Sequence, residues 1–155
     1  MAGLKKSGIA AEKAAVKSVM DQYARVWATE DVRLASQIFA HDDSMVNFGT
    51  DLDEHWVGWK ALRSSLEHQF KAYEKVGVVV RDQVISVHKK RETAWVSEII
   101  DFAVWVGGKR MSVKDCRFTG VLEKRKNEWI FVQSHLSAPV KGQAVEYEDP
   151  KQGHK

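Results

Sequence analysis

The sequence predicts an α+β fold in which three N-terminal helices pack on a curved, mainly antiparallel sheet. Up to Glu74, apolar residues recur every three or four positions, as on one face of a helix, whereas after Glu74 they alternate. The alternating segments are long and are joined by turns of two to five residues, which is typical of neighbouring antiparallel strands.

The first half of the chain has three amphipathic helical segments. The first, at 10–28, places apolar residues on one face: Val16, Val19, Met20, Tyr23, Val26 and Trp27. Glu30 and Asp31 offer caps to a short second helix that ends before His41. Strands at 45–50 and 55–57 form a small hairpin, and Gly58 opens the third helix. That helix repeats Trp59, Leu62, Leu66, Phe70 and Tyr73 at helical spacing.

Four strands follow, at 76–87, 93–106, 110–123 and 129–137, and their turns predict a register. If Gly107 and Gly108 form one turn, Val106 lies opposite Lys109 and Glu98 lies opposite Arg117. If Lys126 and Asn127 form the next, Arg125 lies opposite Glu128 and Thr119 lies opposite Ser134.

Counting from these turns assigns side chains to the two faces of the sheet. One face carries Val96, Glu98, Ile100, Phe102, Val113, Arg117, Thr119, Val132, Ser134 and Leu136. The other carries Trp95, Ile99, Trp105, Phe118, Leu122, Phe131 and His135, with Cys116. Both faces are apolar, yet three helices can cover one face. We therefore expect a homodimer that forms through the open sheet face.

Composition narrows the function classes. The chain has 155 residues, enough for one domain, and its 24 Lys and Arg against 21 Asp and Glu give a net charge of +3. This balance is too weak to indicate nucleic-acid binding, and the basic turns at 89–91 and 124–126 are expected to be solvated. No stretch approaches the roughly 20 apolar residues that span a bilayer. A single cysteine and the lack of a signal peptide favour a cytoplasmic location.

Metal and cofactor chemistry has no support in the sequence. His41, Asp42 and Asp43 are adjacent, and three neighbouring residues rarely aim at one ion, so a turn and cap role is expected. No phosphate-binding glycine loop, nucleophile elbow or zinc-ligand spacing occurs. The expectation is therefore a protein without a cofactor.

Two stretches of sequence carry a family resemblance that covers about 11–139. Asp21-Gln22-Tyr23, Glu30-Asp31-Val32 and Ile38-Phe39-Ala40-His41-Asp42-Asp43 resemble the opening helices of the nuclear transport factor 2-like superfamily, which includes ketosteroid isomerase and SnoaL-like proteins. The segments 117–122 and 129–139 are similar to the end of the SnoaL-like subgroup and to that of the association domain of calcium/calmodulin-dependent protein kinase II. The remaining segments are a flexible N-terminus at 1–10 and a polar tail at 140–155.

The resemblance implies a cone-shaped fold that encloses a pocket, and dimers that form through the sheet. The superfamily holds isomerases, cyclases and dehydratases as well as non-catalytic binding and assembly domains. Tyr23 falls where ketosteroid isomerase has its oxyanion-stabilising tyrosine. Asn47 or Phe48 stands near the place of that enzyme's basic aspartate, and Thr119 stands near the place of its second aspartate.

The candidate catalytic residues are Glu98, Arg117 and Tyr23. Two charges on an apolar face are costly to bury unless they are paired or used, so Glu98 and Arg117 form either an internal ion pair or a working site. In a working site, Glu98 is a base, while Arg117 and Tyr23 stabilise an enolate oxygen. Aromatic residues at such spacing are more often core, but the candidate ligand-binding residues are Trp27, Phe48, Trp56, Trp59, Ile100, Phe102, Thr119, Ser134 and Leu136.

These observations predict a protein that binds a small hydrophobic molecule. One hypothesis is a cofactor-free isomerase, cyclase or dehydratase that acts on a small hydrophobic carbonyl compound. The alternative is a non-catalytic ligand-binding or dimerisation module, in which the ion pair holds the sheet and the open face is the functional surface.

Overall fold

The computed structural model describes residues 8–145, and its elements follow the expected order. The helices are α1 (Ile9–Thr29), α2 (Val32–Ile38) and α3 (Trp59–Ala72). The strands are β1 (Val46–Phe48), β2 (His55–Val57), β3 (Lys75–Val87), β4 (Thr93–Val106), β5 (Lys109–Arg125) and β6 (Glu128–Ser137). Residues 9 and 10 belong to α1 rather than to a flexible N-terminus, while 1–7 and the tail from 146 lie outside the described residues.

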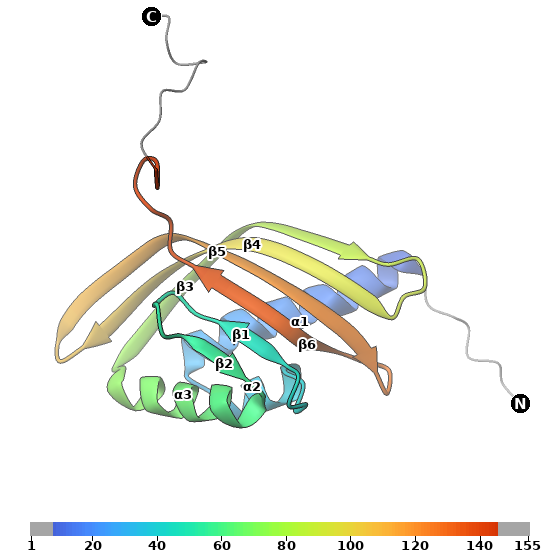
Figure 1. The fold of residues 1–155 in the computed structure, drawn as a ribbon, viewed down its shortest axis with the longest axis horizontal. Helices are drawn as coiled ribbons and strands as arrows, with labels where there is room; N and C mark the ends of the chain where they lie inside the picture. Colours follow the sequence, from blue (N-terminus) through green and yellow to red (C-terminus); the bar gives the residue numbers. More distant parts are fainter. Residues whose placement is uncertain (1–7, 146–155) are drawn as a thin grey trace, which may run out of the picture.

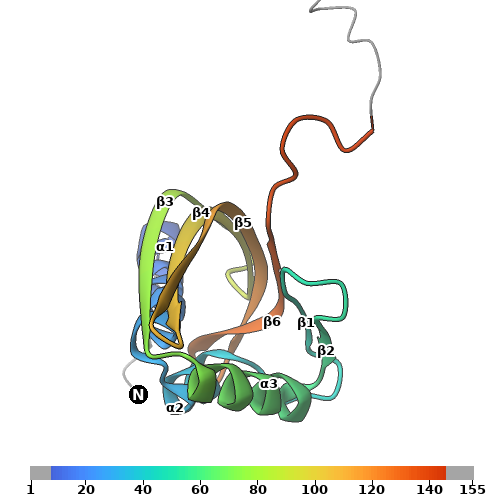
Figure 2. The same cartoon turned by 90° about the vertical axis from the view of Figure 1, so that its left-hand side faces the viewer.

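The six strands form one curved sheet in the order β2-β1-β6-β5-β4-β3. All neighbours are antiparallel except β1 and β6, which run parallel. The three helices lie on one side of the sheet, with α1 along the strands (Figure 1). Figure 2 shows the curvature end on, with α3 running beneath the sheet beside β2. Three helices on one side of a curved, mainly antiparallel sheet are the α+β architecture that the sequence predicts, so the expected fold class is confirmed.

The helix ends follow from local chemistry. The Asp31 side chain accepts hydrogen bonds from the backbone N–H groups of Arg33 (2.8 Å) and Leu34 (3.1 Å), which caps α2 as expected. Gly58 precedes α3 with φ of 81°, a conformation that favours glycine. These ends fix the directions in which α2 and α3 leave the sheet.

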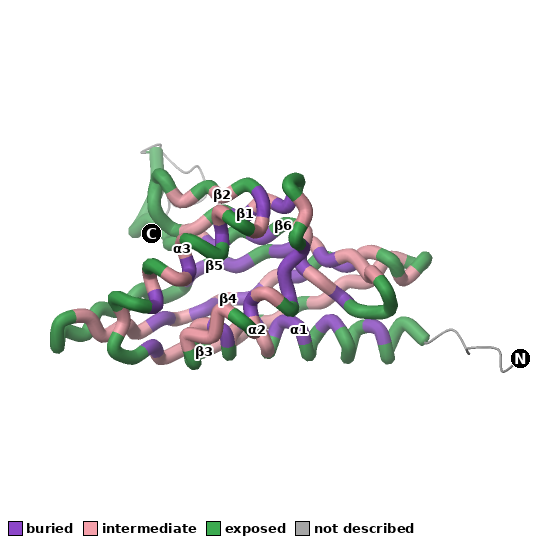
Figure 3. The backbone as a smooth tube through the Cα atoms, turned by 90° about the horizontal axis from the view of Figure 1, so that it is seen from below, coloured by how far each residue is buried: buried purple, intermediate pink, exposed green. Residues whose placement is uncertain are grey.

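The core lies between the sheet and α1. Val16, Met20, Tyr23 and Val26 of α1 are buried, and they come from the apolar face that the spacing predicts. Buried residues gather in the middle of the strands and on the side of α1 that faces the sheet, whereas the strand turns are exposed (Figure 3).

Both predicted hairpin turns are confirmed. Val106 pairs with Lys109, Arg125 pairs with Glu128, and the turn residues between them all have positive φ. Away from the turns, however, the register shifts. Ile100 pairs with Cys116 and Phe102 pairs with Val113, so two residues of β5 lie opposite one residue of β4. This is a β-bulge at residues 114–115, where Asp115 has φ of 58°.

The bulge corrects the predicted pairing of Glu98. Because a shift of one residue turns every later side chain to the other face, Glu98 pairs with Phe118, and Arg117 pairs with Ile99 on the outer face. The prediction that Glu98 lies opposite Arg117 is therefore wrong, and Thr119 is also exposed on the outer face rather than turned inward.

The same shift moves apolar residues inward. Phe118, Leu122 and Phe131 were expected on the open face, but they are buried under the helices, and Cys116 is buried with them. A second bulge at Val132 of β6 compensates, so Ser134 and Leu136 face inward as expected. The outer face is consequently less apolar than the sequence predicted, although Trp95 stays exposed on it.

Candidate functional site

A cavity of about 170 Å³ lies between α1, α3, the β1–β2 hairpin and the ends of β4, β5 and β6. Its wall is mainly apolar and aromatic. Six of the predicted site residues line it: Tyr23, Trp27, Phe48, Trp56, Phe102 and Leu136. An apolar wall with few polar groups is the usual construction of a small-molecule site.

Tyr23 supplies one buried polar group of this wall. Its ring stacks on Phe118 with the ring centres 4.2 Å apart, and the side chain is 4% exposed. Burial raises the pKa of the Tyr23 phenol well above its usual range. The Trp27 indole opposes this rise, and the charge of Glu98 adds to it. At neutral pH Tyr23 is therefore a neutral O–H donor.

Asn47 supplies a second buried polar group. Its Oδ1 accepts a hydrogen bond from Ser134 Oγ at 2.7 Å, which is possible because β1 and β6 pair at these two residues. Within residues 8–145, the Nδ2 group has no hydrogen-bond partner and lies on a side chain that is 8% exposed. Asn47 therefore presents a donor to the cavity.

Carboxylates stand at the opposite, more exposed side of the cavity. Glu54 folds back over Gly49, where a Cβ atom would overlap its carboxylate, and Glu54 Oε2 accepts the Asp51 N–H at 3.1 Å. Asp51 also lines the cavity. Nearby, the Tyr73 hydroxyl donates to Gln69 Oε1 at 3.0 Å. Asp51 and Glu54 escaped the sequence analysis because the connection between β1 and β2 has no periodic pattern.

Glu98 lies outside this cavity, on the inner face of β4. It is 2% exposed, and its Oε2 accepts a hydrogen bond from Gln83 Nε2 at 2.8 Å. Its Oε1 has no hydrogen-bond partner among the described residues. Burial raises the pKa of the Glu98 carboxyl group, and the Gln83 hydrogen bond opposes the rise. This carboxyl group is held under α1 rather than presented to a ligand.

The other predicted site residues fall into two groups. Ile100 and Ser134 are buried away from the cavity wall, and Trp59 stacks on His41 with ring centres 5.0 Å apart. Arg117 and Thr119 point to the outer face. His41 bonds the Ser36 carbonyl of the preceding helix, and Asp42 pairs with Arg125 at the end of β5.

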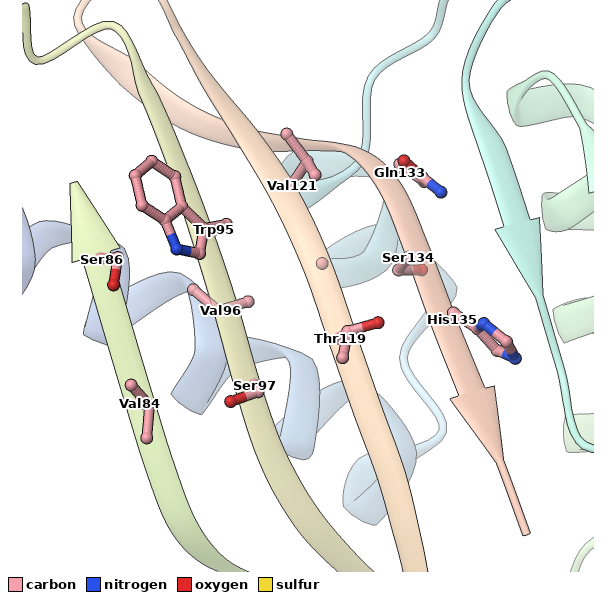
Figure 4. A pocket seen from close by; sticks show the side chains of 11 residues that line it. Val84, Ser86, Trp95, Val96, Ser97, Thr119, Val121, Gln133, Ser134 and His135 are labelled. Carbon is pink, nitrogen blue, oxygen red and sulfur yellow. The ribbon is translucent and has the colours of Figure 1, made fainter. Parts of the chain in front are cut away.

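A broader hollow of about 420 Å³ lies on the outer face of the sheet, across β3, β4, β5 and β6. Trp95, Val121, Thr119, Gln133 and His135 line it, and the helices lie behind the sheet in this view (Figure 4). It is a shallow surface that lacks a carboxylate, so it fits a contact surface better than a catalytic site.

Two negative findings apply to the described residues. No group of three or more His, Cys, Asp and Glu side chains could hold a metal ion among residues 8–145. No helix in the same range is long and apolar enough to cross a membrane.

Comparison with known proteins connects this geometry to a family. The sequence model of the SnoaL-like domain matches residues 16–141, which is most of the chain. The chain belongs to the SnoaL-like domain family. A search of curated proteins finds no match to this SnoaL-like domain.

Solved structures share the fold of this SnoaL-like domain. A nuclear transport factor 2-like superfamily protein from Salmonella enterica superposes with a TM-score of 0.80 at 18% identity, covering 91% of this chain and 100% of that one. A scytalone dehydratase candidate from Novosphingobium aromaticivorans gives a TM-score of 0.72 at 13% identity, over 94% and 97% of the two chains. A candidate calcium/calmodulin-dependent protein kinase II association domain from Xanthomonas campestris gives 0.71 at 22% identity, over 91% and 95%. At these identities the similarity concerns the fold.

Proposed function

We propose that this SnoaL-like domain binds a small, mainly apolar carbonyl compound and moves a proton next to its carbonyl group without a cofactor. The observation that carries the proposal is the cavity that Tyr23 and Glu54 both line, one as a buried neutral donor and the other as a carboxylate. The dehydratase candidate among the solved structures supports the same reaction class. Isomerases, cyclases and dehydratases share this step.

The proposed step is an enolisation. The Glu54 carboxylate removes a proton from the carbon beside the carbonyl, and the C–H electron pair becomes the new C=C bond while the carbonyl oxygen takes up negative charge. Tyr23 and the Asn47 amide donate hydrogen bonds to that oxygen. In a ketone with a neighbouring C=C bond the enolate is conjugated, and return of the proton from Glu54 to the far carbon of that conjugated system completes an isomerisation with no net oxidation.

This proposal transfers the role of base from Glu98 to Glu54. Glu98 is buried under α1 and bonded to Gln83, and Arg117 points away from it on the outer face. Tyr23 keeps the role that the sequence predicted. The apolar part of the ligand would lie against Trp27, Trp56 and Phe102.

The experiment that tests the proposal follows exchange of the α-protons of 2-indanone, a ring-sized ketone, for deuterium in D2O by NMR. Wild-type protein should accelerate the exchange above buffer. The Glu54→Gln variant should lose about 10²-fold or more of that acceleration, because it removes the base. The Tyr23→Phe variant should lose about 10²-fold, because one donor to the developing oxyanion is removed.

Glu67→Gln is the matched control, because it removes the same charge from α3 while lying outside the cavity. It should exchange the ketone at the wild-type rate. Equal rates for wild type and Glu54→Gln, or no acceleration by wild type, would contradict the proposal.

The second candidate is a binding and assembly module that forms a homodimer through the outer face of the sheet. The exposure of Trp95 (51%) and Val84 (58%) on this face supports it, because a soluble protein rarely leaves such residues together in water. Dimerisation is compatible with both candidates. A cytoplasmic location and the absence of a cofactor stay predictions from the sequence.

A further inference from the structure

The charges that line the cavity all have one sign. Asp51 and Glu54 supply two carboxylates, and the described residues of the wall include no Lys, Arg or His side chain. The whole chain carries a net charge of +3, so this acidity is local to the cavity. The negative charge also acts on a residue of the wall: burial and, after it, the charges of Glu54 and Asp51 raise the pKa of Tyr73.

Hydrogen-bond donors and acceptors lie at different ends of the cavity. At the buried end, Tyr23 and Asn47 present donors. At the more exposed end, Glu54 and Asp51 present acceptors. The Tyr73 hydroxyl donates its hydrogen bond to Gln69, so its oxygen remains available as an acceptor. A ligand that matches this arrangement has an acceptor at one end and a donor at the other.

One aromatic residue favours the same orientation. Trp56 is half-buried in the wall and shares the inner face of the β1–β2 pair with Asn47, while the carboxylates of Asp51 and Glu54 line the more exposed mouth of the same cavity. Phe48 turns to the opposite face of these strands, where its ring stacks on that of His55 with the ring centres 4.5 Å apart. Faces of aromatic rings attract cations, and nearby carboxylates strengthen that attraction. A carboxylate ligand would meet like charges at the same mouth.

The size of the cavity limits the ligand further. An apolar cavity of about 150 Å³ holds one benzene molecule. The 170 Å³ cavity therefore has room for a single ring with short substituents, while its mouth lets a polar end reach water.

We propose that the ligand of this cavity is a ring-sized molecule with an acceptor oxygen at its buried end and a protonated amine at the mouth, and that the cavity rejects carboxylates. The inference rests on the proposed function because it concerns the same cavity. It adds the charge of the ligand, which the enolisation step leaves open.

Three matched probes test the charge preference by isothermal titration calorimetry at pH 7 and low salt. They are tyramine (cationic), 4-ethylphenol (neutral) and 3-(4-hydroxyphenyl)propionate (anionic), which share the phenol that the buried donors would hold. We expect tyramine to bind at least tenfold more tightly than the propionate, with 4-ethylphenol between them. Added salt should narrow the ratio.

Two substitutions locate the preference in the cavity. Glu54→Gln and Asp51→Asn should each reduce the ratio of tyramine to propionate affinity by about threefold or more and leave 4-ethylphenol affinity nearly unchanged. Glu67→Gln and Asp53→Asn remove the same charges from α3 and from the β1–β2 turn, outside the cavity wall, and should leave the ratio as in wild type.

The possible outcomes separate the inference from the proposed function. If 4-ethylphenol binds but the propionate binds as tightly as tyramine, the inference fails and the ligand cavity stands. If the control variants change the ratio as much as Glu54→Gln, the preference comes from the overall charge, and the inference also fails. If no probe binds, the cavity does not hold a ring-sized phenol, and the inference fails even where 2-indanone exchange succeeds.

Discussion

Burial of Glu98 works against folding at neutral pH, because its carboxyl group holds its proton more tightly in the folded chain than in the unfolded one. Below the ordinary glutamate pKa of 4.5, Glu98 is protonated in both the folded and the unfolded chain, and its favourable contribution to the free energy of unfolding is complete. It is lost as the pH rises through the raised pKa of the folded state. The raised pKa of Glu98 should therefore lower the free energy of unfolding of the wild-type protein between acidic and neutral pH.

The Glu98→Gln variant should remove that loss. An amide stays neutral at every pH and can still accept the hydrogen bond from Gln83. Relative to wild type, the variant should gain free energy of unfolding as the pH rises from 4.5 to 8. Urea denaturation at several pH values measures the difference.

Exposed Glu128 serves as the control for this measurement. Glu128→Gln should show little change of the difference with pH. A Glu98→Gln difference that stays constant, or falls, between pH 4.5 and 8 would contradict the raised pKa of Glu98.

At the scale of elements, Glu12 attaches the beginning of α1 to the β5–β6 hairpin. It is 3% exposed, and its two carboxylate oxygens accept hydrogen bonds from Lys124 Nζ at 2.7 Å and Trp129 Nε1 at 2.9 Å. These contacts join residues more than a hundred positions apart in sequence. Helix α1 is thereby held along the sheet, with Tyr23 placed at the cavity.

We expect Glu12→Gln to lower the free energy of unfolding by about 3 kcal/mol, because Lys124 loses its buried partner. Glu67→Gln removes an exposed partner of Arg63 on α3 and should cost a few tenths of a kcal/mol. Chemical denaturation of both variants checks the difference. Equal losses would mean that the buried pair contributes no more than an exposed one.

The elements could be predicted from the sequence because their signals are local. The helical spacing of apolar residues in α1 predicted that Tyr23 and Trp27 lie on its inner face. The turn residues predicted which residues pair next to each hairpin turn. The bulge at Asp115 could not be predicted, because counting from a turn assumes one residue opposite one, and no glycine marks the positive φ there.

The candidate site could be predicted only in part, because some of its residues lie on elements with a local sequence pattern and others do not. Residues on periodic elements, such as Phe102 and Leu136, reach the cavity as expected. Glu54 and Asp51 lie in the connection between β1 and β2, whose path over α3 depends on tertiary packing. The expected partner of Glu98 was lost to a shift of one residue.

For the whole molecule, the outer face of the sheet is the surface on which we expect a second copy of the chain to pack. The helices lie on the other side, while Trp95 and Val84 stay exposed beside the intermediate Val121. The Asp101 and Asp115 carboxylates pair with Arg81 on this face, so the charges of these three residues are paired within one chain. A second copy of the chain could therefore cover Trp95 and Val84 without separating the Arg81 ion pairs.

We expect wild-type protein to have twice the 17.6 kDa chain mass in light scattering coupled to gel filtration. Trp95→Glu should shift it to the mass of one chain, because it places charge in the middle of the contact. Val57→Glu, an exposed valine on β2, should leave the mass unchanged. A wild-type protein with the mass of one chain, or a Trp95→Glu variant that stays double, would contradict dimerisation through this face.

The parallel pairing of β1 with β6 has a consequence for the order in which the chain folds. Asn47 and Ser134 are 87 positions apart, and their contact forms part of the structure beside the cavity. A growing chain on the ribosome displays α1, α2 and the β1–β2 hairpin long before the strand that completes their sheet has been translated. Contacts of such large sequence separation form late and slowly. The ligand cavity is thus among the last parts of the protein to be assembled, so ligand added during synthesis cannot guide the early folding steps.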